Sequence, residues 1–315
     1  MTRPSDVTAD HAGTGSQERR GINFVNRRLG LSSFAHSAVV LSAILIACAV
    51  AIWVSWLNDN AVLRDKAIAV TNGLTTVSAK IIAINQWVYR NQGFAPNKRY
   101  FLIPALGPTP VQVLQSGGEC EDKARLVSAM LRQLGIDSGL VQIFPCEDCG
   151  PIHTVVEAEY DSGRMVVDPT WNIEYPSGNG EFLGVQDLAG SSVGREHIHD
   201  LQARRGAGDK IQFMSEAEAT FDYARAVNWR KNAVSRAAAF GLRILGYTPE
   251  QMLRPHFLED PKLALTLFFL ASAAALVVVD YMLFLALAGP FRRLRAAFRL
   301  RVSNGRVITV HDKPD

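Results

Sequence analysis

The stretch GGECEDKARLVSAMLRQLGI, at residues 117–136, places a cysteine at the head of a strongly helical pattern. Gly135 stands where a glycine commonly follows the last helical turn. Apolar side chains recur at helical spacing behind the cysteine, at Ala124, Val127, Met130 or Leu131, and Leu134. The stretch therefore predicts a helix that begins at Cys120. Cys120 shares the apolar face because it lies four residues before Ala124.

A cysteine at a helix N-terminus is well placed to act as a nucleophile. The thiolate is the nucleophile, and the unpaired N–H groups and the dipole of a helix N-terminus favour that anion. A buried structural thiol is the alternative for Cys120 taken alone, because free cysteines are among the most buried residues. A catalytic cysteine also requires a neighbouring base and a group that orients this base.

Short β-branched segments follow the helix at residues 138–144, 152–160 and 164–169. Asp161-Ser162-Gly163 separates the last two and predicts a hairpin. Helical periodicity returns over about 216–245, and it also predicts one or two helices over 62–91. Helices before and after an antiparallel sheet indicate an α+β domain.

His153 begins one strand of the predicted hairpin and Asp168 ends the other. In an antiparallel pair, residues directly opposite each other have numbers with a constant sum. If this sum is odd, His153 and Asp168 lie on the same face of the sheet, because side chains alternate between the faces along each strand. A turn centred on residues 162–163 would offset them by four positions, and one centred on 160–161 would place them directly opposite each other. The sequence leaves this register open.

The order of these elements resembles the transglutaminase-like superfamily. The resemblance covers residues 110–171 and rests on a Gly-x-Cys-x-x-x-Ala helix start, a Leu-Arg-x-Leu-Gly-Ile helix end, HTVVE and the closing MVVDPTW. It implies a papain-like α+β core in which Cys120 is the nucleophile, His153 the general base and acid, and Asp168 the group that orients the imidazole. The family includes enzymes that transfer acyl groups from amides to amines and enzymes that hydrolyse amides, so we expect neither a cofactor nor a metal.

An oxyanion hole is the part of such a site that the sequence defines least. The backbone N–H of Cys120 is the first candidate donor. Gln86 and Trp87, on a predicted helix upstream, could supply a second N–H, but an aromatic residue at helical spacing is more often part of the core. The chain also has Val155 two residues after the histidine, where many family members carry an aromatic residue.

Cys146 and Cys149 form a separate feature on the loop between two predicted strands. We expect a small structural disulfide, although free thiols and redox work also remain open. A thioredoxin-type motif would open a helix, whereas Gly150-Pro151 follow here. A zinc site would need two more ligands, and the pair His197 and His199 is the nearest candidate.

Two long apolar runs stand out from a composition of 48% apolar and 20% charged residues that is ordinary for a globular protein. Each is long enough to cross a bilayer. Lipoprotein processing at Cys48 is the disfavoured alternative, because apolar residues follow that cysteine. The predicted order is a cytoplasmic disordered tail at 1–36, a transmembrane helix at 37–57, an extracytoplasmic domain at 58–262 with its core at about 74–175, a transmembrane helix at 263–288 and a basic cytoplasmic tail at 289–315.

Charge predicts the orientation of the two spans. Arginines cluster before the first span and after the second, whereas residues 58–262 carry 21 basic and 24 acidic side chains, a net charge of −3. Positive flanks stay in the cytoplasm, so both termini lie inside and the middle segment lies outside. The overall charge of +3 therefore reflects topology and gives no sign of a nucleic-acid partner. The expected location is a plasma (inner) membrane.

These features favour a membrane-anchored cysteine amidase, peptidase or acyltransferase that acts on peptide or protein amides of the cell envelope. The alternative is a non-catalytic scaffold or binding module of an envelope assembly. Asp280 lies within the second apolar run, where a charge is costly unless it faces a partner, so a membrane-protein partner is expected there besides the lipid bilayer. A thiol oxidoreductase that uses Cys146 and Cys149 is a third hypothesis.

Overall fold

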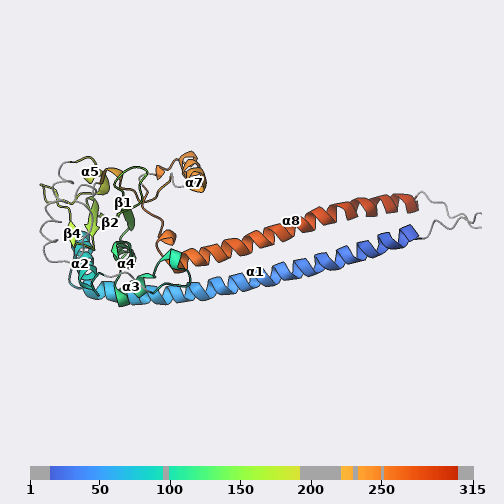
Figure 1. Ribbon diagram of the computed structural model, residues 1–315, viewed down its shortest axis with the longest axis horizontal. Coiled ribbons are helices and arrows are strands. Elements are labelled where there is room, and N and C mark those ends of the chain that lie inside the picture. The colour runs from blue at the N-terminus through green and yellow to red at the C-terminus, as the bar shows by residue number, and fades with distance from the viewer. Residues whose placement is uncertain (1–14, 95–98, 192–220, 230–232, 250–251, 304–315) are drawn as a thin grey trace, which may run out of the picture. The chain divides into compact units, whose positions relative to one another are not determined.

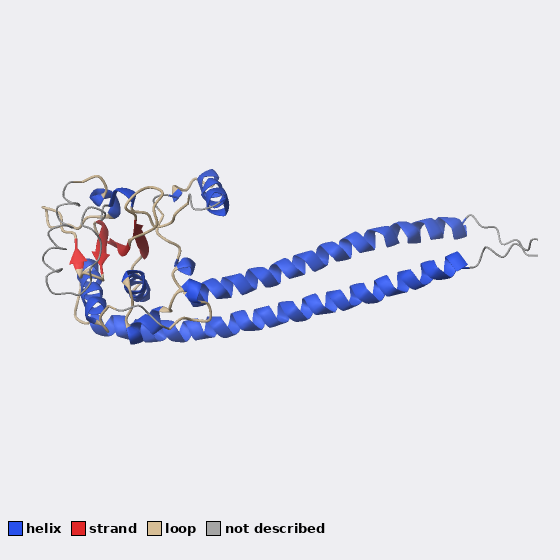
Figure 2. Ribbon diagram, viewed as in Figure 1, coloured by secondary structure: helices blue, strands red, loops and turns tan. Residues whose placement is uncertain are grey.

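The structure is a computed structural model that describes residues 15–94, 99–191, 221–229, 233–249 and 252–303. The chain divides into two units, Val50–Leu267 and a second made of Met1–Ala49 with Phe268–Asp315. The first unit contains short helices and a four-stranded antiparallel sheet (Figures 1 and 2). The predicted α+β class is thereby confirmed.

Two long helices, α1 (Gly15–Val70) and α8 (Pro261–Ser303), are apolar enough to cross a membrane. The candidate spans within them are Ser37–Val70 and Pro261–Leu285, and only 17% of the most apolar window of each is buried. Large exposed apolar surfaces of this kind suit contact with lipid rather than with water.

Both helices extend further than the sequence predicts. α1 begins at Gly15, inside the segment predicted to be a disordered tail, and α8 continues to Ser303, inside the predicted basic tail. The physical reason is cooperativity. A residue added to the end of an existing helix needs no new nucleus, so polar flanking residues can continue a helix that an apolar segment has started.

The C-terminal end of α1 belongs to the core of the larger unit. Leu63 and Ala67 are buried in the same cluster as Ile81, Val127 and Met130. The C-terminal part of the helix that contains the first candidate span therefore packs inside the domain.

Three shorter helices surround the cysteine-bearing stretch: α2 (Val77–Arg90), α3 (Pro110–Ser116) and α4 (Cys120–Gln133). α2 and α4 bury apolar side chains against one face of the sheet, and α3 packs against α4. Thr76 caps α2 by accepting from the N–H of Ala79, and Thr109 forms a reciprocal capping box with Gln112 at the start of α3. These caps satisfy N–H groups that the first helical turn leaves unpaired.

The sheet has the sequential order β1 (Ser138–Ile143), β2 (His153–Tyr160), β3 (Gly163–Asp168) and β4 (Ile173–Glu174), with each neighbouring pair antiparallel. Tyr160 pairs with Gly163, so the turn is the dipeptide Asp161-Ser162. This register lies between the two considered from the sequence. It offsets His153 and Asp168 by two positions along the strands, because paired numbers sum to 323.

The 3₁₀ turn η1 (Pro104–Leu106) lies between α2 and α3. After the sheet come α5 (Val185–Leu188), the 3₁₀ turn η3 (Phe221–Tyr223), α7 (Ala233–Ile244) and the 3₁₀ turn η5 (His256–Leu258). The predicted long helix over 216–245 is wrong for residues 221–229. Phe221 is buried in the cluster on the second face of the sheet, and Arg225 pairs with Gln142 of β1 through two backbone hydrogen bonds. Tertiary contacts therefore override the helical periodicity at residues 221–229, whereas α7 covers Ala233–Ile244 as predicted.

Candidate active site

Cys120 is the first residue of α4, and its side chain is half-buried. Glu119 and Asp122 form a capping box, in which Asp122 Oδ2 accepts a hydrogen bond of 3.3 Å from the Glu119 N–H. Gly118 must lack a side chain here, since a Cβ would lie 2.3 Å from the Cβ of Asp122. The helix N-terminus therefore places the Cys120 side chain beside the backbone N–H groups of the first helical turn, at the positive end of the helix dipole.

His153 and Asp168 come together at one end of the hairpin. Both side chains are buried, and His153 Nε2 lies 2.7 Å from Asp168 Oδ2. The two-position offset between the strands is thus short enough for a direct contact between the side chains. Since Nε2 faces the carboxylate, Nδ1 is the ring nitrogen that remains for a nucleophile.

Asp168 is itself held by the backbone that follows it. Its Oδ1 accepts hydrogen bonds from the N–H of Thr170, at 2.8 Å, and from the N–H of Trp171, at 3.3 Å. The second oxygen is thereby left for His153. The DPTW motif therefore fixes the carboxylate as an orienting group through a turn that immediately follows β3.

The electrostatics of His153 connect it to both other residues. Burial by itself lowers the pKa of His153, but the charge and hydrogen bond of Asp168, together with a hydrogen bond and the charge of Cys120, raise it to about 10. An imidazole held in its protonated form is the partner that stabilises an adjacent thiolate. Cys120, His153 and Asp168 thus form one interacting set.

Lys123 is a buried component of this region that the sequence analysis missed. Its Nζ donates hydrogen bonds to the carbonyl oxygens of Val88, at 3.1 Å, and Tyr89, at 3.0 Å, in the last turn of α2. Burial lowers the pKa of Lys123 to about 8, against an opposing effect of the Asp168 charge. The signal in the sequence was its spacing: Lys123 lies four residues before Val127, on the apolar side of α4.

Gln86 and Trp87, the two upstream candidates for the second hydrogen-bond donor to the oxyanion, have different surroundings. Trp87 packs against the first hydrophobic cluster, with Lys66 Nζ 5.4 Å from the centre of its ring, whereas Gln86 is exposed. Their neighbour Asn85 is buried, and its Nδ2 donates to the Ile173 carbonyl at 3.5 Å. The packing of Trp87 agrees with the role of a core residue.

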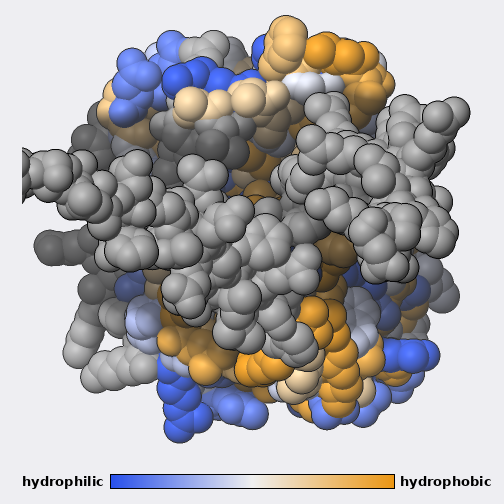
Figure 3. Space-filling model, turned by 90° about the vertical axis from the view of Figure 1, so that its right-hand side faces the viewer, coloured by the Kyte–Doolittle hydropathy of each residue, from blue (hydrophilic) through white to orange (hydrophobic). Residues whose placement is uncertain are grey.

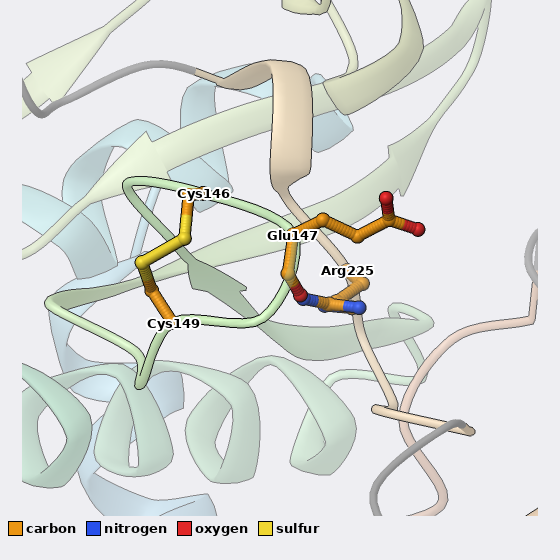
Figure 4. Close-up of a disulfide and its surroundings, with 4 residues drawn as sticks. All are labelled: Cys146, Glu147, Cys149 and Arg225. Atoms are coloured by element: carbon orange, nitrogen blue, oxygen red, sulfur yellow. A yellow bond between two sulfur atoms is a disulfide. The ribbon is translucent and has the colours of Figure 1, made fainter.

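Cys146 and Cys149 are joined by a disulfide in the loop that leads from β1 to His153. Arg225 contacts this loop twice. Its guanidinium donates a hydrogen bond to the Glu147 carbonyl (Figure 4), and it also lies 4.2 Å from the centre of the Phe144 ring. Both contacts restrict the segment that immediately precedes the histidine. The alternative zinc ligands His197 and His199 lie outside the described residues.

Comparison with known proteins gives one family match, to the transglutaminase-like superfamily over residues 64–169. This match begins well before the resemblance at residues 110–171 and takes in the end of α1 and all of α2. A search of curated protein sequences finds no significant match.

Two solved structures are similar to part of the chain. A candidate cysteine protease from Cytophaga hutchinsonii is 21% identical, with a TM-score of 0.31 over 39% of this chain and 40% of that one. A candidate protease from Parabacteroides distasonis is 19% identical, with a TM-score of 0.27 over 41% of this chain and 30% of that one. The chain thus spans less than half the length of these relatives. By the family match and the fold, this chain contains a transglutaminase-like domain at residues 64–169.

Proposed function

We propose that this protein is a membrane-anchored cysteine hydrolase or acyltransferase that acts on peptide or protein amides outside the cytoplasm. The observation that carries the proposal is the 2.7 Å contact between His153 Nε2 and Asp168 Oδ2, on an imidazole that also interacts with Cys120. A nucleophile, a base and an orienting group in this relationship are the parts that acyl transfer requires.

The first half-reaction forms a thioester. The Cys120 thiolate attacks the carbonyl carbon of an amide, and the C=O electron pair moves to oxygen. The helix N-terminal N–H groups next to Cys120 are suitable donors to that oxyanion. As the tetrahedral species collapses, the C–N bond breaks and protonated His153 gives its proton to the leaving amine.

The second half-reaction releases the acyl group. Water or an amine attacks the thioester carbonyl while neutral His153 accepts a proton from the attacking group, and Cys120 leaves as the thiolate. Both acceptors use the same residues. We favour hydrolysis, because water has free access to a half-exposed thiol.

Two observations support a location outside the cytoplasm. Arginines precede the first candidate span and follow the second. The positive-inside rule predicts this distribution when both termini lie in the cytoplasm. The Cys146–Cys149 disulfide lies in the segment between the spans, and disulfides persist in oxidising compartments.

An activated ester provides a test that needs no knowledge of the natural substrate. The full-length protein in lipid nanodiscs is treated with p-nitrophenyl acetate, and the peptide that contains Cys120 is examined by mass spectrometry. We expect a hydroxylamine-sensitive acetyl adduct on Cys120, lost in Cys120→Ser and retained in the matched control Cys48→Ser. His153→Gln should slow its formation.

The same experiment distinguishes the remaining alternatives. An added primary amine that accepts the acetyl group faster than water does would indicate an acyltransferase. Acetylation of Cys120 that proceeds equally fast in His153→Gln would overturn the catalytic proposal and favour a non-catalytic binding module.

A further inference from the structure

Helix α7 presents an unusual apolar stripe to its surroundings. Ala233, Ala237, Phe240 and Ile244 follow a spacing of four, three and four residues, so they share one face, and all four are exposed. The exposed fraction of Phe240 is 63%, that of Ile244 is 70%, and Leu245 directly after the helix reaches 71%. Ala239 is buried and marks the side of α7 that packs on the domain. The helix is therefore amphipathic, with its larger apolar side chains facing outward.

A second apolar element lies on the loop at residues 100–103. Leu102 is 70% exposed, and its φ of +57° is uncommon for a residue other than glycine. The neighbouring Phe101 ring lies 5.3 Å from Nζ of Lys262, in the first turn of α8. This contact places the loop beside the start of the second candidate span.

Both elements lie at the end of Val50–Leu267 from which α8 starts. Figure 1 shows α7 at the same end of this unit as the first turn of α8. Figure 3 views the molecule from that side, and hydrophobic surface lies at the top of the picture, where Figure 1 places α7. α7 and the start of the second candidate span therefore lie at the same end of this unit.

We propose that α7 and the loop at 100–103 lie in the headgroup region of the bilayer that α1 and α8 cross, and that they dock the domain on an anionic lipid surface. Exposed apolar residues on a short amphipathic helix insert to the depth of the headgroup and acyl boundary. Arg236 and Arg243 are exposed on the same helix and suit contact with anionic lipid phosphates.

A lipid surface fits these elements better than a protein partner does. A protein partner would lose translational freedom when it binds these apolar side chains. The bilayer is already attached to this end of the domain through the candidate spans, so docking on lipid avoids that cost. The docked domain would have a restricted orientation relative to the membrane, and its active site would act at a defined height above the lipid.

Spin labels measure this docking directly in the full-length protein. In a Cys48→Ser, Cys120→Ser background, single labels are introduced by Ile244→Cys and Leu102→Cys, and the protein is placed in nanodiscs containing phosphatidylglycerol. Molecular oxygen concentrates in lipid, whereas a nickel chelate remains in water. We expect oxygen to relax both labels more strongly than the chelate does.

Two control labels separate the possible failures. Ser162→Cys, on the exposed β2–β3 turn, should respond mainly to the chelate, and Val277→Cys, on the exposed face of the second candidate span, mainly to oxygen. If labels 244 and 102 behave like label 162 while label 277 responds to oxygen, the docking is overturned and the membrane anchor stands. If label 277 also responds mainly to the chelate, the anchor itself fails. Dipolar broadening between labels at 244 would assign the surface to a second copy of the chain and would likewise overturn the proposal.

Discussion

His153 and Asp168 lie two positions out of register on neighbouring antiparallel strands, and their side chains nonetheless meet at 2.7 Å. The contact depends on the two-residue turn at Asp161-Ser162, which sets this offset. The backbone N–H groups of Thr170 and Trp171 then hold the other carboxylate oxygen. Asp168 therefore determines both the orientation of the His153 ring and the raised pKa of this imidazole.

Replacement of this carboxylate tests its orienting role. Asp168→Asn can still accept from the two backbone N–H groups but removes the charge that raises the pKa of His153. We expect acylation of Cys120 to fall roughly 10²- to 10⁴-fold, the range seen when the base loses its orienting carboxylate. NMR titration of the imidazole should show a lower pKa. Asp161→Asn, on the exposed turn, is the matched control and should change neither quantity.

The raised pKa of His153 also predicts how stability changes with pH. Its pKa is about 10 in the folded protein and roughly 6.5 in the unfolded chain, so the folded state binds the proton more tightly. The stability that this contributes is complete below about pH 6.5 and is lost as the pH rises towards 10. Denaturant unfolding of the wild type and His153→Gln should therefore show a difference in free energy that shrinks across this range. A difference that is constant or grows with pH would contradict the assignment.

Lys123 should contribute to the junction between α2 and α4. Lys123→Met removes two hydrogen bonds to carbonyl groups near the end of α2, and it also removes the cost of burying a charge. The unpaired carbonyls cost more, so we expect a net loss of about 1–3 kcal/mol in the free energy of unfolding. Lys80→Met, on the same α2 helix but only partly buried, is the control for loss of a lysine. Equal unfolding free energies for the two variants would rule out this role.

The Cys146–Cys149 disulfide should stabilise the loop before His153. The double substitution Cys146→Ser/Cys149→Ser removes a disulfide that closes a very short loop. The chain-entropy model gives a loss of about 2 kcal/mol in the free energy of unfolding for a loop of this length. Because Arg225 also holds the loop, we expect the fold to survive and the acylation rate of Cys120 to fall. Circular dichroism and the ester probe measure the two effects. An unchanged acylation rate would show that the loop does not position His153.

Glu259 should fasten the start of the second candidate span to the domain core. Its carboxylate accepts from Leu140 N–H at 2.8 Å and Ser128 Oγ at 2.9 Å, and it pairs with Arg132 at 3.4 Å. Glu259→Gln leaves Arg132 without this countercharge, and we expect a loss of about 3–5 kcal/mol in unfolding free energy. The exposed Glu181 provides a matched Glu→Gln control, which should stay within about 0.5 kcal/mol of the wild type.

Local patterns in the sequence predicted most elements that surround the site. Cys120 begins α4 as its spacing indicated, and the strand segments at 138–144, 152–160 and 164–169 correspond to β1, β2 and β3. Helix periodicity and strand alternation depend on neighbouring residues, so they can be recognised without a fold. The helix predicted over 216–245 is correct at α7 but wrong at residues 221–229, because burial of Phe221 and pairing of Arg225 are long-range contacts.

The sequence by itself determined the two apolar spans, the helix that starts at Cys120 and the presence of His153 and Asp168 on successive strands, because each follows from local composition or spacing. Only the tertiary structure decided the register that joins His153 to Asp168, the burial of Lys123 against α2, and the entry of α1 into the core. These features depend on which segments, far apart in the sequence, pack against each other and bury their apolar surfaces. The local sequence pattern does not specify this packing, because a shift of one residue in strand register or of one helical turn would change the contacts between the segments.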